Sequence, residues 1–252
     1  PLGRGAWARV QLAQHLTSGE AYALKTVSKR ELLRRGTLDV VVKERRLVRL
    51  CAHPNVVELY TSYQDAESVH LLFEHLPGGE LGALLRREGP LDLPAARFYA
   101  ACVLSALEAV HDAGVVHRDV RPENLLLDRK GYLKLLDFGF ATEAAADERA
   151  TTLCGCAEYL APEVLSGEGH GAAADWWALG VLAYEMLAGS PPYAERHTPM
   201  KLFAAILRGG LPDNWRQPDR RQPSAGLSPE AAALCRALLV RDPRARLAAA
   251  RK

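Results

Sequence analysis

The residue pattern of the chain changes character at Pro77-Gly78-Gly79. Before this tripeptide, short β-type runs predict four strands, at 9–13, 21–27, 56–60 and 69–74. One helical stretch, 37–50, interrupts them. After the tripeptide the pattern is mainly helical, most clearly at 93–113 and 176–188. This order of elements predicts an α+β fold with two lobes that meet at a glycine-rich hinge.

We expect a β-rich N-terminal lobe with one main helix at residues 1–76, and a larger, mainly helical C-terminal lobe at 77–252. Within the second lobe, 125–127 and 133–136 are predicted as short strands joined by the turn Arg129-Lys130-Gly131. The junction between two lobes is a common place for a ligand-binding cleft.

Composition argues against several other classes of protein. The 252 residues are 48% hydrophobic and 25% charged, which is typical of globular domains. A formal net charge of +2 gives no reason to expect a nucleic-acid partner, and no run of about 20 uncharged apolar residues predicts a membrane span. Five cysteines without CxxC spacing favour a reducing compartment, so we expect a cytoplasmic location. Because the chain begins with Pro1 rather than Met, we expect it to be part of a longer protein.

A glycine-rich string lies near the start of the chain, from Leu2 to Val10. Gly3 and Gly5 let the backbone approach phosphates closely and donate N–H groups to them. Ala8 stands where the usual pattern has its third glycine. Taken alone, the string is equally compatible with an ordinary tight turn.

Lys25 follows an apolar strand, and Glu44 on the next helix is well placed to pair with it. A lysine held by such a carboxylate can bind the α- and β-phosphates of a nucleotide. The plainer interpretation is an exposed strand end and a solvated helix residue.

The strongest signal is the string His117-Arg118-Asp119-Val120-Arg121-Pro122-Glu123-Asn124, followed by Asp137-Phe138-Gly139. Asp119 is suited to accept the proton of an attacking hydroxyl. Asn124 and Asp137 supply the hard oxygen ligands that Mg²⁺ prefers. Both strings lie in loops beside the two short predicted strands, which can aim these side chains at one point.

These strings resemble the signature of eukaryotic serine/threonine protein kinases, and the resemblance continues through Ala161-Pro162-Glu163, Asp175-Trp176-Trp177 and Arg246. Residues 137–141 and 158–163 resemble the cyclic-nucleotide-dependent kinases of the AGC group. Residues 189–193, with 199–201 and 206–209, favour the cGMP-dependent branch.

The resemblance implies Mg-ATP as cofactor and assigns roles to individual residues. Lys25 and Glu44 form an ion pair, Asp119 is the catalytic base, Arg121 steadies the γ-phosphoryl group, and Asn124 and Asp137 hold the metal. Further ATP contacts are implied for Leu2, Gly3, Gly5, Val10, Ala23, Phe73, Glu74, Leu76 and Leu126. Glu163 is expected to pair with Arg246, and Phe138, His117, Val48 and Leu59 to form a stacked apolar spine between the lobes.

The resemblance also implies a substrate class and a means of regulation. Glu80, Glu123 and Glu185 match acidic positions that select arginines upstream of the target Ser or Thr. Thr152 aligns with a phosphorylated activation-loop threonine, although an ordinary loop residue is the plainer interpretation and Thr151 is adjacent. Cyclic-nucleotide-binding regulatory domains are expected, if anywhere, outside this chain.

Three further residues depart from the family pattern: Arg121 replaces a lysine, Cys156 a threonine and Ala157 a proline. An arginine keeps the charge but not the compact ammonium, and a cysteine is a weak hydrogen-bond donor. Arg121, Cys156 and Ala8 therefore leave an alternative, a pseudokinase or low-activity regulatory module that binds nucleotide and acts as a signalling scaffold. A small-molecule phosphotransferase is disfavoured by the Ala-Pro-Glu segment and the acidic peptide-selecting positions.

Overall fold

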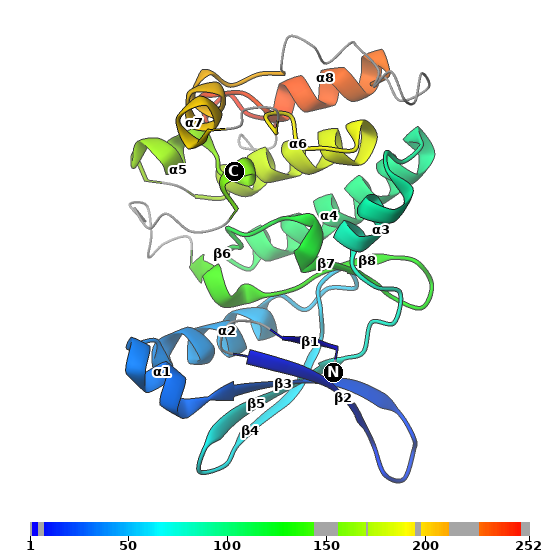
Figure 1. Ribbon diagram of the computed structural model, residues 1–252, viewed down its shortest axis with the longest axis vertical. Helices are drawn as coiled ribbons and strands as arrows, with labels where there is room; N and C mark the ends of the chain where they lie inside the picture. Colours follow the sequence, from blue (N-terminus) through cyan, green and yellow to red (C-terminus); the bar gives the residue numbers. More distant parts are fainter. Residues whose placement is uncertain are drawn as a thin grey trace.

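The computed structural model describes residues 2–4, 8–143, 156–169, 171–194, 198–211 and 227–247. A sheet-rich part, formed by the first third of the chain, lies at one end of the long axis, and a helical part lies at the other (Figure 1). The predicted two-lobed α+β fold is confirmed. Gly5 and Thr152, two of the predicted site residues, lie outside the described residues.

The sheet-rich part is built on a five-stranded antiparallel sheet in the order β1-β2-β3-β5-β4. Its strands are β1 (Gly3–Arg4), β2 (Ala8–Gln14), β3 (Ala21–Ser28), β4 (Leu59–Gln64) and β5 (Ser68–Glu74). Lys25 lies opposite Val10 on β2 and Leu71 on β5, while Ala23 lies opposite Phe73. Since directly paired residues and every second residue share a face, these five side chains line one face of the sheet.

Two helices connect β3 to β4: α1 (Lys29–Arg35) and α2 (Leu38–Leu50). Helix α2 matches the predicted stretch, whereas α1 was not predicted. Charged residues dominate α1, and Leu32 is its one buried side chain, so it has no apolar stripe that a pattern could reveal. Gly36 ends it in the left-handed conformation, with φ of 66°.

The strand predicted at 56–60 is wrong in position, because β4 begins at Leu59. Val56 and Val57 are buried, but they pair with Leu135 of the helical part through a parallel bridge and a 3.0 Å hydrogen bond to its carbonyl. The apolar run therefore marks a contact between the two parts of the molecule. The strand itself continues into Tyr63 and Gln64 as a largely exposed edge.

The glycine-rich hinge is attached to the helical part. Gly78 donates its N–H to the carbonyl of Leu127 (2.9 Å), and Leu127 donates to the carbonyl of Gly79 (2.9 Å). A Cβ at Gly78 would lie 2.5 Å from the Cβ of Leu127, so no other residue fits there without a shift of the backbone. The two-way pairing fixes the chain where it enters the helical part.

The helical part contains α3 (Leu81–Glu88), α4 (Leu93–Asp112), α5 (Pro162–Ser166), α6 (Ala173–Ala188), α7 (Pro199–Arg208) and α8 (Pro229–Leu238). Helix α6 packs against α4 on one side and α8 on the other. It starts three residues earlier than predicted, at Ala173, and most of its residues are buried. Such a helix shows little amphipathic pattern from which to read its start.

Helix α4 alone, among the described residues, is long and apolar enough to cross a membrane by length and composition. It packs against α6 and β8, with Leu107 and Val110 fully buried, as a core helix does. Its start follows the predicted pattern: Asp92 caps the helix by accepting the N–H of Ala95 (2.8 Å), and Pro94 lies in the first turn.

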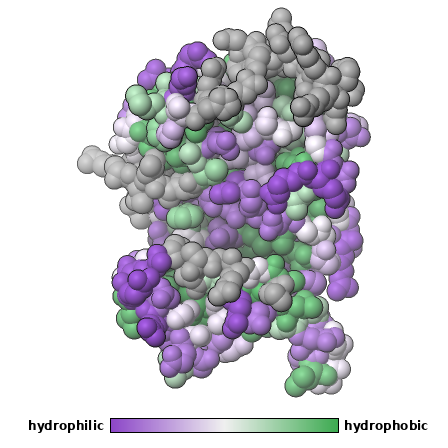
Figure 2. Space-filling view, viewed as in Figure 1, coloured by the Kyte–Doolittle hydropathy of each residue, from purple (hydrophilic) through white to green (hydrophobic). Residues whose placement is uncertain are grey.

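The helical part also contains short elements: β6 (Val115–Val116), β7 (Leu125–Leu127), β8 (Leu133–Leu135) and β9 (Thr142–Glu143), with the 3₁₀ turns η1 (Pro122–Asn124), η2 (Phe138–Phe140) and η4 (Ala157–Tyr159). Strand β6 pairs with β9, and β7 pairs with β8 as predicted. In the space-filling view, hydrophobic residues are visible at the waist between the two parts, bordered above by a hydrophilic band (Figure 2).

Candidate active site

Lys25 joins the sheet to both neighbouring acidic groups. Its Nζ lies 2.6 Å from Oε1 of Glu44 on α2 and 3.5 Å from Oδ1 of Asp137. Burial lowers the pKa of Lys25, but the two carboxylates outweigh burial and the net shift is upward. The lysine is therefore a fixed cation on the sheet face that carries Val10 and Ala23.

A buried carboxylate shapes the loop that carries Asp119. Asp175 of α6 is fully buried and accepts the backbone N–H groups of His117 and Arg118, each at 2.8 Å, and His111 Nε2 lies 2.8 Å from the same carboxylate. Burial raises the pKa of Asp175, but these partners outweigh burial and hold its pKa below the ordinary value. The carboxylate stays ionised and fixes the backbone immediately before Asp119.

Two residues near the site hold the left-handed backbone that side chains other than glycine rarely adopt, namely Arg118 (φ 69°) and Asp137 (φ 57°). In the described part of the chain they are the only such residues. Strained backbone of this kind persists where surrounding contacts over-determine it, and it concentrates at functional sites.

Asp119 and Asn124 are joined within one loop. The amide Nδ2 of Asn124 donates to the carboxylate Oδ2 of Asp119 (2.6 Å) and to its backbone carbonyl (2.8 Å). Burial raises the pKa of Asp119, and the hydrogen bond from Asn124 only partly offsets this. Asp119 is thereby held as a partly buried, oriented proton acceptor.

The donor set fits a hard divalent cation. Both donor protons used by Asn124 go to Asp119, which leaves the amide oxygen free to act as a ligand. The side chain of Asp137 is 48% exposed, and Lys25 and the N–H of Gly139 outweigh the effect of burial and hold its pKa below the ordinary value. An amide oxygen and an ionised carboxylate are ligands that Mg²⁺ prefers.

An aromatic contact within the helical part lies behind the site. The rings of His117 and Phe138 meet edge to face, with centroids 5.0 Å apart, and both side chains are buried. The turn that carries Phe138 contacts α2, where Val48 is buried, and Leu59 of β4 is buried in the same core.

The predicted adenine-site residues lie on the sheet and on β7. Val10, Ala23, Phe73 and Leu126 are half-buried, Leu2 and Gly3 are exposed, and Leu76 is buried. The side chain of Glu74 is already engaged, because it pairs with Lys134 (2.6 Å) and accepts the N–H of Glu58 (2.8 Å). The backbone N–H of Glu74 is engaged as well, because it donates to the carbonyl of Glu58 (3.0 Å).

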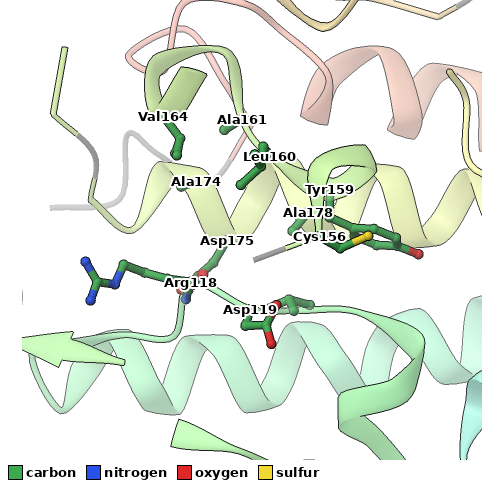
Figure 3. Close-up of a pocket in the computed structure, with 11 residues that line it drawn as sticks. Arg118, Asp119, Cys156, Tyr159, Leu160, Ala161, Val164, Ala174, Asp175 and Ala178 are labelled. Carbon is green, nitrogen blue, oxygen red and sulfur yellow. Dashed lines mark hydrogen bonds between the residues drawn. The ribbon is translucent and has the colours of Figure 1, made fainter. Parts of the chain in front are cut away.

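The described residues also form a small pocket between the loop of Asp119 and the 156–164 segment (Figure 3). Asp119 and Cys156 face it from opposite sides, and Arg118 extends away from Asp119. Within the described residues no hydrogen bond joins Cys156 to Asp119 or Arg121, so the thiol does not bridge the loop to the base.

The family described as Protein kinase domain matches residues 1–251. The chain belongs to the protein kinase family. The human cAMP-dependent protein kinase catalytic subunit PRKX is 40% identical over 210 residues, 83% of this chain and 58% of that protein. The cAMP-dependent catalytic subunit of Arthrobotrys oligospora is 41% identical over 208 residues, 82% of this chain and 40% of that protein. Human cGMP-dependent protein kinase 2 is 40% identical over 208 residues, 82% of this chain and 27% of that protein.

The relatives of this kinase confirm the resemblance to cyclic-nucleotide-dependent AGC kinases. Identities of 41% and 40% do not separate the cAMP-dependent branch from the cGMP-dependent branch that the sequence favoured. The chain spans 40% and 32% of the length of two of the cAMP-dependent catalytic subunits that it matches.

The three predicted substrate-binding acids of the kinase lie on different elements. Glu80 precedes α3 and Glu123 is in η1, and Arg86 lies 3.8 Å from a carboxylate oxygen of each. Glu185 on α6 accepts a hydrogen bond from the hydroxyl of Tyr159. Each carboxylate therefore already has an internal partner.

Two contacts of the kinase were missed at the sequence level. Lys43 Nζ donates to Thr142 Oγ1 (3.0 Å), and Arg46 Nη2 lies 3.0 Å from Glu143 Oε2. Both join α2 to β9, across about a hundred residues of sequence. The only available signal was the spacing of Lys43 and Arg46 on one helix face, which is equally typical of a solvated surface.

Proposed function

We propose that this kinase domain transfers the γ-phosphoryl group of Mg-ATP to serine or threonine hydroxyls of proteins. One observation carries the proposal: Lys25 contacts Asp137, and Asn124 contacts Asp119, so that a fixed cation, two metal-ligand side chains and a proton acceptor lie around one loop-lined site. An enzyme that transfers phosphoryl groups needs little beyond positioning and charge stabilisation.

In the proposed reaction each residue has a separate task. Lys25, oriented by Glu44, binds the α- and β-phosphates, and Asn124 and Asp137 would hold Mg²⁺, which would offset the negative charge of the phosphates. The substrate hydroxyl oxygen bonds to the γ-phosphorus while the bond from that phosphorus to the β,γ-bridging oxygen breaks. ADP leaves with the electron pair, and Asp119 receives the hydroxyl proton.

The acidic side chains support a basic substrate segment. Glu80, Glu123 and Glu185 lie around the loop that holds Asp119, and guanidinium groups pair well with carboxylates. We therefore propose arginines upstream of the target residue, as the resemblance implies. A cytoplasmic location, and regulation by cyclic-nucleotide-binding domains outside this chain, are part of the same proposal.

A nucleotide-binding regulatory module is the second candidate. It is favoured by Arg121 and Cys156, which replace two residues of the catalytic loop contact, and by the absence of a hydrogen bond between Cys156 and Asp119 among the described residues. Retention of Lys25, Asp119 and Asp137 favours the active enzyme, because a module that only binds nucleotide has no need of a proton acceptor.

Phosphate transfer from Mg-ATP to an Arg-Arg-x-Ser peptide tests the proposal, with Asp137→Asn as the matched control. Transfer that disappears in the control supports a working, basic-directed kinase. If no transfer occurs while Mg-ATP still raises the melting temperature, the regulatory module is supported instead. A control that transfers phosphate as well as the unmodified chain contradicts the assignment of Asp137.

A further inference from the structure

Two side chains with different proposed tasks are bonded to each other. The Nε of Arg121 donates to Oε2 of Glu123 at 2.8 Å, and the two side chains remain 30% and 40% exposed. Among the described residues, Glu123 is the one ion-pair partner of Arg121. Burial lowers the pKa of Arg121, but the carboxylate of Glu123 outweighs burial and the net shift is upward, as expected for a cation paired with a carboxylate.

The backbone favours this contact. Arg121 is extended (φ −161°, ψ 160°) and Pro122 begins the η1 turn, so the side chains two positions apart can meet on one side of the chain. No other element needs to move for the pair to form. An ion pair that is this local and this exposed is also weak enough to exchange partners.

The pair competes with both proposed tasks. A substrate arginine that binds Glu123 must replace or share Arg121, while a phosphoryl group beside Asp119 attracts the same guanidinium. The second carboxylate oxygen of Glu123 faces Arg86 at 3.8 Å, so each of its oxygens has a cation near it before any substrate arrives. Glu185 offers no ready substitute, because its carboxylate is already bonded to the Tyr159 hydroxyl.

We propose that the Arg121–Glu123 ion pair is an exchangeable link that couples peptide binding to nucleotide binding. A basic side chain of the peptide that takes Glu123 releases Arg121, and the released guanidinium then binds the terminal phosphate of the nucleotide beside Asp119. Reciprocally, a nucleotide that attracts Arg121 frees Glu123 for the peptide. This inference rests on the proposed function, and it adds that each substrate strengthens the binding of the other.

Equilibrium binding tests the link without any turnover. Isothermal titration of an Arg-Arg-x-Ala peptide is carried out with and without Mg²⁺ and a non-hydrolysable ATP analogue. In the unmodified chain the analogue is expected to tighten peptide binding by about tenfold, within the usual range for coupled sites. In Arg121→Met, the peptide is expected to bind more tightly without nucleotide, and the analogue is expected to change its affinity by less than about twofold. Arg121→Lys, which keeps the charge, should retain part of the coupling.

Two neighbouring arginines provide controls. Arg87 pairs with Glu88 (2.6 Å) and its side chain is 71% exposed, so Arg87→Ala should leave both affinities and the coupling unchanged. Arg86→Ala removes a cation from Glu123 without touching Arg121, so it should tighten peptide binding and preserve the coupling.

The experiment distinguishes failure of the proposed coupling from failure of the proposed function. If peptide and analogue both bind the unmodified chain but do so independently, the coupling is overturned and the proposed function stands. If Arg121→Met keeps the full coupling, the link is overturned in the same way. If neither ligand binds the unmodified chain, both the inference and the proposed function are overturned.

Discussion

Glu163 and Arg246 lie 83 residues apart and form a bidentate ion pair, with Nη1–Oε1 at 2.7 Å and Nη2–Oε2 at 3.0 Å. Both side chains are buried. The guanidinium also donates to the carbonyl of Val240 and lies over the ring of Trp177, 5.3 Å from its centroid. The expected pair thus joins the segment before α6 to the end of the described chain, with the remaining donors satisfied.

Removing one partner of this pair should destabilise the kinase strongly. Arg246→Met leaves the Glu163 carboxylate buried and uncompensated, which typically costs about 3–5 kcal/mol in the free energy of unfolding. Urea unfolding followed by tryptophan fluorescence measures the change. Arg244→Ala, on an exposed residue of the same segment, should stay within about 0.5 kcal/mol. Equal stability of the two variants would contradict a structural role for the pair.

Asp119→Asn should reduce turnover by about 10²–10⁴-fold, because the amide cannot accept the hydroxyl proton. Nucleotide affinity should change little, since the amide oxygen of the new side chain can still accept the hydrogen bond from Asn124. Single-turnover phosphate transfer and a fluorescent-nucleotide titration measure the two quantities separately. A loss of nucleotide affinity equal to the loss of turnover would assign Asp119 to binding instead.

The pKa values of Asp119 and Asp65 should be shifted in opposite directions from the ordinary value of 3.8. Burial raises the pKa of Asp119, so activity should be lost, as pH falls, at a higher pH than for a free carboxyl. His70 and two backbone N–H groups hold the pKa of Asp65 at about 2. Carboxyl ¹³C NMR, assigned with Asp119→Asn, measures both pKa values.

The raised pKa of Asp119 also has a consequence for stability. Since its folded-state pKa lies above the unfolded value, its favourable contribution is complete only below the unfolded pKa, and is lost as pH rises through the folded pKa. At pH 7 the ionised carboxylate weakens the fold, so Asp119→Asn should raise the melting temperature. A lower melting temperature at pH 7 would show that other contacts of Asp119 dominate.

Lys25→Met should lower kcat/KM by about 10²-fold, since the phosphates lose the cation that positions them. Glu44→Gln should produce a similar but smaller loss, because Lys25 then keeps only the longer contact to Asp137. Steady-state transfer assays at varied ATP measure both. Lys29→Met is the matched control, because Lys29 lies just beyond the end of the same strand and donates to the carbonyl of Asp65. Normal activity of the Lys25→Met variant would contradict the assignment of Lys25 to phosphate binding.

Periodic elements were predictable from the sequence, and non-periodic ones were not. Strands β3 and β5 and helix α4 lie within one residue of their predicted bounds, because alternation and a long apolar stripe survive in the sequence. The misplaced β4 shows the opposite case, since burial of Val56 and Val57 comes from a contact across the molecule. Such contacts leave no local pattern.

In the candidate site, too, some features were predictable from the sequence and others were not. Spacing was enough to single out Asp119, Asn124 and Asp137, because residue type and order carry their chemistry. The orientation of Asp119 depends on Asp175, whose carboxylate accepts the N–H groups of the two preceding residues, 57 and 58 positions away in the sequence. The pairing of Arg121 with Glu123 was not predicted, because each residue was assigned a separate ligand.

Helix α2 has contacts in two directions. Glu44 holds Lys25 of the sheet, while Lys43 and Arg46 hold β9 beside the loop of Asp137. An outward rotation of this helix would break all of these contacts together, so intermediate positions of α2 are not expected to be stable. A compound that stabilised the rotated helix would therefore be expected to switch each kinase molecule fully from the active to the inactive state. Its concentration would set the fraction of inactive molecules, and the turnover rate of each active molecule would stay the same.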